Sequence, residues 1–109
     1  MTLSTHILDV EAGRPAAGVP VRAERYDPGY GAWTVAGEGV SGVDGRVGEL
    51  VDPARWVPGR WRLVFDTAAV HGPDAFWPQV TVEFAVAEPV HHHVPLLLAR
   101  HGYTTYRGS

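Results

Sequence analysis

Three consecutive histidines, His91-His92-His93, are the densest group of side chains in this sequence that can exchange protons near neutral pH. Successive side chains on a strand point to opposite faces, so His91 and His93 would share one face and His92 would take the other. Most aliphatic residues around the run have the parity of His92. We therefore expect His91 and His93 on the polar face, with Pro95 favouring an edge strand or a break in the ladder.

A further histidine, His6, lies in another candidate strand near the start of the chain. Together with His91 and His93 it could supply three imidazole ligands to a zinc ion. However, this spacing of histidines is common, and no carboxylate lies beside the run to complete a ligand set. A solvated polar face is the other interpretation of these histidines, and we predict no metal and no cofactor.

Arg46 and the last four residues of the chain are further candidates for a functional site, because they carry charged and hydrogen-bonding groups. Arg46 follows Asp44-Gly45, a pair that favours a tight turn because glycine accepts a positive φ. The chain ends in Tyr106-Arg107-Gly108-Ser109: a rigid aromatic ring, a permanent cation, a flexible hinge and a carboxylate. The strand preference of the residues before this end predicts a last strand that holds it in a fixed place, whereas a frayed polar tail is the alternative.

The composition excludes several classes of function. The length of 109 residues predicts one domain over residues 1–109. The net charge is −3 and the nine arginines are scattered, which argues against nucleic-acid binding. There is no cysteine, no Gly-x-Ser-x-Gly motif and no phosphate-binding glycine loop. No stretch approaches the ~20 apolar residues of a membrane span and no signal-peptide pattern begins the chain, so we expect no membrane partner and a cytoplasmic location.

The elements that must position these groups are short strands that alternate apolar and polar residues and are separated by Gly, Pro and Asp. Eight candidate strands follow: Leu3–Val10, Val19–Glu24, Trp33–Val40, Val47–Leu50, Trp61–Asp66, Val80–Val86, Val90–Leu98 and Tyr103–Arg107. One short helix is predicted from about Thr67 to His71, with Asp66 or Thr67 as its N-cap and Gly72-Pro73 as its end. The pattern predicts an all-β sandwich of two sheets.

Four segments are more specific in combination than any single residue, and they span the whole chain. In order they are Ser4-Thr5-His6-Ile7-Leu8-Asp9, Asp44-Gly45-Arg46, His93-Val94-Pro95-Leu96-Leu97-Leu98, and the end of the chain from Gly102 to Ser109. With Phe76-Trp77-Pro78-Gln79-Val80, they resemble the 5-hydroxyisourate hydrolase family, the enzymatic relatives of transthyretin. The terminal Tyr-Arg-Gly-Ser is the segment that separates these hydrolases from hormone-binding transthyretins.

The resemblance implies a transthyretin-like β-sandwich of two four-stranded sheets and a homotetramer with active sites in clefts at the dimer–dimer interface. It also implies that the site is lined by His6, Arg46, His93 and the tetrapeptide from Tyr106 to Ser109. The sequence departs from the family pattern in two places: His92 stands where tyrosine is typical, and Ala99-Arg100-His101 replaces a segment that commonly contains proline and an aromatic residue.

The reaction implied is hydrolysis of 5-hydroxyisourate to 2-oxo-4-hydroxy-4-carboxy-5-ureidoimidazoline in urate breakdown, with no metal required. His6 and His93 are the candidates for general base and acid, in an order that the sequence leaves open. Arg46 would stabilise the developing oxyanion, and Ser109 would orient a histidine or the attacking water. Tyr106, Arg107 and Gly108 would contribute to substrate binding. A carrier that binds flat aromatic ligands without chemistry is the alternative function.

Overall fold

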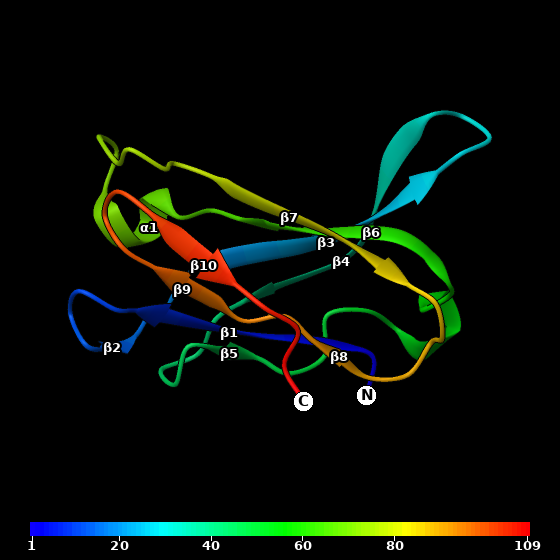
Figure 1. The fold of residues 1–109 in the computed structure, drawn as a ribbon, viewed down its shortest axis with the longest axis horizontal. Coiled ribbons are helices and arrows are strands. Elements are labelled where there is room, and N and C mark those ends of the chain that lie inside the picture. The colour runs from blue at the N-terminus through cyan, green and yellow to red at the C-terminus, as the bar shows by residue number, and fades with distance from the viewer.

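Two β-sheets packed face to face form the protein in the computed structural model, which describes residues 1–109 (Figure 1). The first sheet has the strand order β4-β3-β6-β7 and is antiparallel throughout. Its strands are β3 (Pro20–Asp27), β4 (Ala32–Val40), β6 (Gly59–Phe65) and β7 (Val80–Val86). Trp61, Leu63 and Phe65 alternate along β6 and are fully buried, so the inner face of this sheet is apolar.

The second sheet is organised around β1 (Leu3–Asp9). Antiparallel strands β2 (Arg14–Pro15) and β5 (Arg46–Val47) pair with one edge of β1, while β8 (His92–His93) and β9 (Leu96–Leu98) pair with it in parallel. The last strand, β10 (Tyr103–Thr105), is antiparallel to β9. Segments from the start, middle and end of the chain therefore meet on one strand, as Figure 1 shows.

The all-β sandwich of two sheets is confirmed, but the structure has ten strands where we expected about eight, and the second sheet has six strands instead of the four that the resemblance implies. The candidate Val90–Leu98 is divided into β8 and β9 around Pro95, which has no N–H to donate to a ladder. The candidate Val47–Leu50 pairs only over Arg46–Val47, although Leu50 still donates its N–H to the carbonyl of Leu3. Arg14–Pro15, which lies outside all the candidate strands, forms the two-residue strand β2.

The helices are short. The predicted helix is present as α1 (Ala68–His71), and Gly72, at φ +88°, ends it as expected. Thr67 stands at the N-cap position but does not cap the helix, because its hydroxyl donates to the carbonyl of Trp77. A 3₁₀ turn, η1 (Pro53–Arg55), was not predicted. No helix in the fold has the length and apolar character needed to cross a membrane.

The core lies between the sheets and fixes which way β1 faces. Leu3, Thr5 and Ile7 are all fully buried, and burial of one large aliphatic side chain contributes about 1.5–3 kcal/mol. Because side chains alternate along a strand, Ser4 and His6 must face the outside of the sheet. A one-residue slip of β1 would bury His6 and expose Ile7, so the core determines the register that the outer face depends on.

Gly45 allows the turn before β5 to pass close to β1. Its φ is +78°, and a Cβ at this position would collide with the carbonyl oxygen of Ile7. Gly13 has a similar φ of +70°, but a Cβ there would meet no atom within 4 Å. Both glycines therefore have a positive φ that favours glycine, but only Gly45 also lies against the backbone of another strand.

We expect Gly45→Ala to lower the free energy of unfolding more than Gly13→Ala does. Each substitution places a side chain in the left-handed region at a cost of about 1–2 kcal/mol, and only Gly45→Ala adds a collision with backbone. Urea denaturation of both variants measures the difference. Equal losses would contradict the contact with Ile7 as the reason for glycine at this position.

Candidate active site

Polar residues from β1, β5 and β8 meet on the outer face of the second sheet. Ser4 is in register with His93, and His6 is in register with Arg46. Paired residues on neighbouring strands point to the same face, and Ser4 and His6 face outward because their neighbours in β1 fill the core. The sandwich thus brings together four side chains that are up to 89 positions apart.

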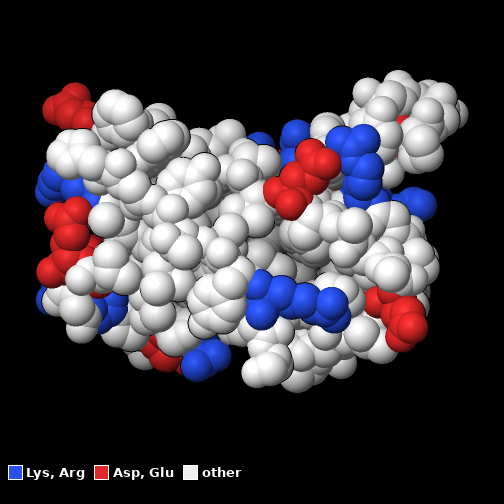
Figure 2. Space-filling model, viewed as in Figure 1, with Lys and Arg blue, Asp and Glu red and all other residues white.

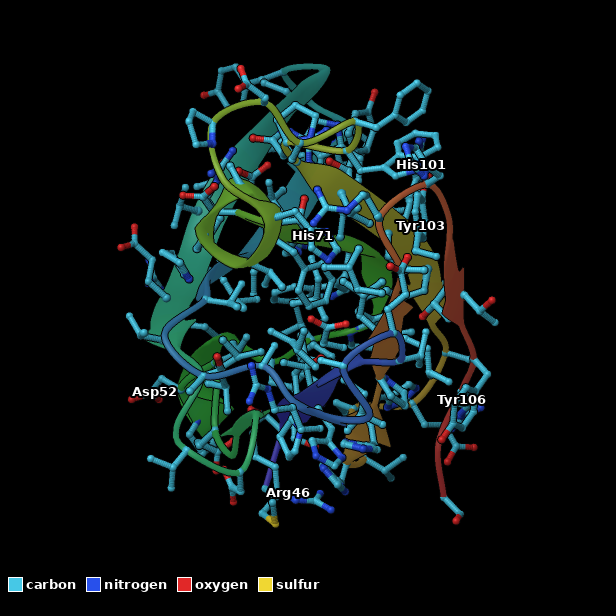
Figure 3. All side chains as sticks on the ribbon, turned by 90° about the vertical axis from the view of Figure 1, so that its left-hand side faces the viewer. Arg46, Asp52, His71, His101, Tyr103 and Tyr106 are labelled. Atoms are coloured by element: carbon cyan, nitrogen blue, oxygen red, sulfur yellow. The ribbon has the colours of Figure 1, made fainter.

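The C-terminal tail returns across this face. After β10, Gly108 forms an isolated antiparallel bridge with His93 and donates its N–H to the carbonyl of His93 at 2.7 Å. In Figure 1 the two ends of the chain lie at the same side of the molecule, beside β8. Figure 3 shows Arg46 and Tyr106 toward one end of the molecule, away from His101 and Tyr103. The tail is held in place and is not frayed.

The tail, β1, β5 and β8 enclose an open cavity of about 420 Å³. Its lining residues are Met1, Ser4, Thr5, Arg46, Gly48, His91, His93, Tyr106, Gly108 and Ser109. Five of the residues predicted from the sequence are therefore at one site. A larger hollow of about 540 Å³ over β3 and β4 contains no histidine, so volume alone does not identify a site for acid–base chemistry.

Gly108 is required by its contact with His93. A Cβ at position 108 would lie 2.5 Å from Cδ2 of the His93 ring, closer than real side chains approach. Its φ is not in the left-handed region, so the expected role as a flexible hinge has no basis in an unusual backbone conformation. Glycine instead lets the tail pack directly on the imidazole.

Two predicted residues do not line this cavity. The Nε2–H of His6 donates to the carbonyl of Asp44 at 2.8 Å, and the side chain of Asp44 accepts the N–H of Arg46 at 3.0 Å. This hydrogen bond from His6 thus stabilises the turn that precedes Arg46. Arg107 lines a separate hollow beside β7, together with His92, and Tyr106 borders both this hollow and the cavity.

The histidine run divides as predicted. His92 is buried and its ring packs against Trp56, whereas His91 is exposed and His93 is half-buried. His91 and His93 both contact the hydroxyl of Ser4, which lies 2.7 Å from Nε2 of His91 and 2.8 Å from Nδ1 of His93. This bond occupies one ring nitrogen of His93 and leaves Nε2 available to a ligand.

Sequence reasoning did not assign Ser4 to the site and considered His91 only as a metal ligand. The signal that could have found Ser4 is its position two residues before His6, on the same face of the strand. Its pairing with His93 depends on the parallel register of β1 and β8, which local sequence does not specify. No group of three or more His, Cys, Asp or Glu side chains is arranged to hold a metal ion.

Electrostatics distinguishes His93 from the other histidines. Burial lowers the pKa of His93 below its usual value of 6.5, and the positive charge of Arg46 lowers it further, as do His91 and His6. The ring is therefore neutral near pH 7 and can accept a proton at Nε2. Arg46 remains cationic, so the cavity combines a neutral base with a fixed positive charge. This pair suits hydrolysis of a carbonyl compound, in which water loses a proton and an oxygen gains negative charge.

The family model described as HIUase/Transthyretin family matches residues 3–108 of this chain. The 5-hydroxyisourate hydrolase of Salmonella dublin is 42% identical over 112 residues, which cover 98% of this chain and 80% of the relative. The uric acid degradation bifunctional protein TTL of Arabidopsis thaliana is also 42% identical, over 120 residues. This match covers 98% of the chain but only 37% of the Arabidopsis protein.

Solved structures of two kinds share the fold. The 5-hydroxyisourate hydrolase of Klebsiella pneumoniae superimposes with a TM-score of 0.82 and 33% identity, and each chain is covered completely. Sea bream transthyretin, solved in complex with thyroxine, superimposes with a TM-score of 0.88 and 30% identity over 99% of this chain and 95% of that one. The sandwich is thus common to a protein described as a hydrolase and to a transthyretin solved in complex with thyroxine.

We expect NMR titration to show a pKa for His93 below 6.5 that rises in the Arg46→Ala variant. Removing the guanidinium removes a charge that opposes protonation of the ring, while burial continues to hold the pKa down. The matched control is Arg14→Ala, which removes an exposed arginine from β2, outside the cavity. If the wild type, Arg46→Ala and Arg14→Ala all had the same pKa at His93, the charge of Arg46 would not be a cause of the lowered pKa.

Proposed function

The chain belongs to the HIUase/transthyretin family, and we propose that it hydrolyses 5-hydroxyisourate to 2-oxo-4-hydroxy-4-carboxy-5-ureidoimidazoline in urate breakdown. Relatives described as 5-hydroxyisourate hydrolases match nearly the whole chain. The observation that carries the proposal is the cavity in which the neutral base His93, the cation Arg46 and the C-terminal tail converge. It supplies both of the groups that opening a cyclic amide requires.

In the proposed mechanism His93 is the general base. Its Nε2 removes a proton from water as the water oxygen attacks the ring carbonyl, and its lowered pKa keeps this nitrogen free at neutral pH. Arg46 donates hydrogen bonds to the carbonyl oxygen as negative charge develops on it. When the C–N bond breaks, the imidazolium of His93 returns the proton to the leaving nitrogen.

The remaining site residues position these groups and the substrate. We assign His6 to the turn that carries Arg46, because its ring bonds to Asp44, and its charge also acts on His93. Tyr106 and Ser109 line the cavity and would hold the polar edge of the substrate ring. Gly108 contributes by its contact with His93, whereas a role for Arg107 in binding would require a different position of its side chain or a second copy of the chain.

A non-enzymatic carrier is the alternative, and the fold alone does not decide against it, because sea bream transthyretin superimposes as well as the hydrolase does. The lining of the cavity favours the enzyme. A carrier of flat aromatic ligands gains affinity from apolar walls, whereas the lining of this cavity includes Arg46, two histidines and two serines. Polar groups of this kind are used when charge develops during a reaction.

We also propose that the chain forms a homotetramer, as the family resemblance implies. Strands β7 and β10 are both edge strands and have unpaired backbone groups along one side. Figure 2 shows that the surface over β10 and the adjoining part of β7 is largely uncharged. Tyr103 and Tyr106 are among the exposed large hydrophobic residues, so association of copies over this face would cover apolar surface. The cytoplasmic location stays a prediction.

We expect the protein to accelerate the loss of ultraviolet absorbance of 5-hydroxyisourate generated by uricase. His93→Ala should reduce turnover by about 10²–10⁴-fold, the usual contribution of a general base, and Arg46→Ala by about 10²–10³-fold through loss of oxyanion stabilisation. Circular dichroism of each variant separates loss of chemistry from loss of fold.

His101→Ala and Arg14→Ala are the matched controls, because they remove an exposed histidine and an exposed arginine outside the cavity. The rate should also survive exhaustive treatment with EDTA. A decay no faster than the spontaneous one would overturn the proposed activity, and loss of activity with EDTA that zinc restores would favour a metal-dependent hydrolase.

We expect Gly108→Ala to lower kcat while the fold is retained. The added methyl group would push the His93 ring away from its position, and small displacements of a base from the reacting atoms reduce proton transfer strongly. Gly102→Ala is the matched control, because a Cβ at position 102 would meet no atom within 4 Å. Steady-state kinetics that show the same kcat for both variants would mean that the tail does not position His93.

A further inference from the structure

Ser4 lies between two histidine rings, and neither Ser4 nor His91 has a role in the mechanism above. The Ser4 hydroxyl is 2.8 Å from Nδ1 of His93 and 2.7 Å from Nε2 of His91. Both distances are those of hydrogen bonds, whereas the two rings, with centroids 6.4 Å apart, are too far from each other to bond directly. Ser4 is buried, at 5% exposure, so its hydroxyl is held in place between them.

The number of protons on these groups limits the tautomers that the two rings can adopt. A serine hydroxyl has one proton to donate, and a neutral imidazole has an N–H at one ring nitrogen and a lone pair at the other. Only one of the two histidines can accept the Ser4 proton, so at least one of them has to donate its own N–H to Ser4 Oγ. If His93 donates, its proton is at Nδ1 and its Nε2 is bare. If His91 alone donates, Ser4 donates to Nδ1 of His93, and the proton of His93 is at Nε2.

These two arrangements differ in whether His93 can act as a base toward the cavity. A bare Nε2 can take a proton from water, whereas an Nε2 that already carries a proton cannot. In histidines generally, the hydrogen bond made by one ring nitrogen determines whether the other nitrogen is protonated. The contact between Ser4 and Nδ1 is therefore the interaction that decides whether His93 is a base.

The surroundings of His93 favour the arrangement with the proton at Nδ1. Arg46 is a permanent cation that lines the same cavity, so it favours a lone pair at Nε2 over an N–H. Burial and the charge of Arg46 lower the pKa of His93, whereas the backbone of Ser4 acts to raise it, as an acceptor of a ring N–H does. The cation in the cavity and the acceptor at Ser4 thus select the same tautomer.

We propose that Ser4 and His91 hold His93 in the tautomer that acts as a base, an inference that rests on the proposed hydrolase function. Nδ1–H of His93 donates to Ser4 Oγ, and Ser4 donates its own proton to Nε2 of His91. His91 thus directs the Ser4 proton away from His93, so that the Ser4 oxygen is left to accept. Ser4 and His91 are positioning residues that act through the ring of His93.

This arrangement is restored at the end of each turnover. When Nε2 takes a proton from water, His93 becomes an imidazolium, and its hydrogen bond from Nδ1–H to Ser4 becomes charge-assisted and therefore stronger. The proton on Nε2 passes to the leaving nitrogen when the C–N bond breaks, so Nε2 is bare again. The Nδ1 proton of His93 does not move in any step, and no proton passes through Ser4 or His91.

The tautomer can be measured without activity, by ¹⁵N chemical shifts of the histidine rings in the intact protein well above pH 6.5, where His93 is neutral. We expect Nδ1 of His93 to show the shift of an N–H and Nε2 that of a bare nitrogen. Ser4→Ala should move both shifts toward those of a mixture of tautomers. Ser4→Thr should restore them because it keeps the hydroxyl, and His101→Ala should leave them unchanged. A wild-type His93 protonated at Nε2, or shifts that Ser4→Ala does not change, would overturn the proposal whatever the protein hydrolyses.

The part played by His91 is tested by the same measurement. His91→Ala removes the acceptor of the Ser4 proton, which can then point toward Nδ1 of His93. The shifts of His93 should therefore move in the same direction as in Ser4→Ala. Shifts of His93 that are the same in His91→Ala and the wild type would overturn the role of His91. Because His91 also lines the cavity, its effect on the tautomer is judged from these shifts and not from turnover.

The consequence for catalysis is tested by steady-state hydrolysis of 5-hydroxyisourate. Ser4→Ala should lower kcat by about tenfold with KM unchanged, because a tenfold factor corresponds to about 1.4 kcal/mol, the size of one hydrogen bond. Ser4→Thr should restore kcat, and His101→Ala should leave it unchanged. A Ser4→Ala protein with the kcat of the wild type would overturn the role of the tautomer in catalysis. Inactive wild-type protein would instead refute the hydrolase function, while the ring shifts would still decide which nitrogen of His93 is protonated.

Discussion

The burial of alternate side chains of β1 is the constraint on which the rest of the site depends. Leu3, Thr5 and Ile7 fill the core, so Ser4 and His6 have to face outward. The same strand pairs with β5 on one edge and with β8 on the other, and these pairings place Arg46 beside His6 and His93 beside Ser4. Any change that shifted β1 by one residue would both expose the core and disperse the polar cluster. Stability and the geometry of the site are thus secured by the same strand.

The C-terminal tail is the second element that the cavity requires, and its placement follows from a backbone contact. Gly108 bonds to the carbonyl of His93, and its lack of a side chain lets the tail lie against the imidazole. Burial is also the largest cause of the lowered pKa of His93. The tail thus forms one wall of the cavity and packs against the ring of His93.

The sequence predicted those parts of the fold and site that follow from local patterns. Alternation correctly separated His92 from His91 and His93, and the lack of an N–H in Pro95 correctly indicated an interrupted strand. The contact between Ser4 and both histidines was not predicted, because it depends on a parallel pairing between residues about 90 positions apart. The orientation of Arg107 was missed for a related reason, since the face that a tail residue takes depends on where the tail pairs.

The grouping of positive and ionisable side chains on this face is better explained by chemistry than by stability. Arg46, His6 and His91 lie close enough to His93 for their charges to lower its pKa, in addition to the effect of burial, so protonation of His93 is opposed within the folded protein. A surface selected only for stability would contain counter-charges or apolar residues at these positions, as on the opposite sheet, where Glu24 accepts hydrogen bonds from two arginines. A cavity that keeps a histidine neutral beside a permanent cation instead suits a reaction in which a base takes a proton from water while an oxygen gains negative charge. Sea bream transthyretin, solved in complex with thyroxine, has the same sandwich, so the function has to be inferred from the side chains of the site and not from the fold.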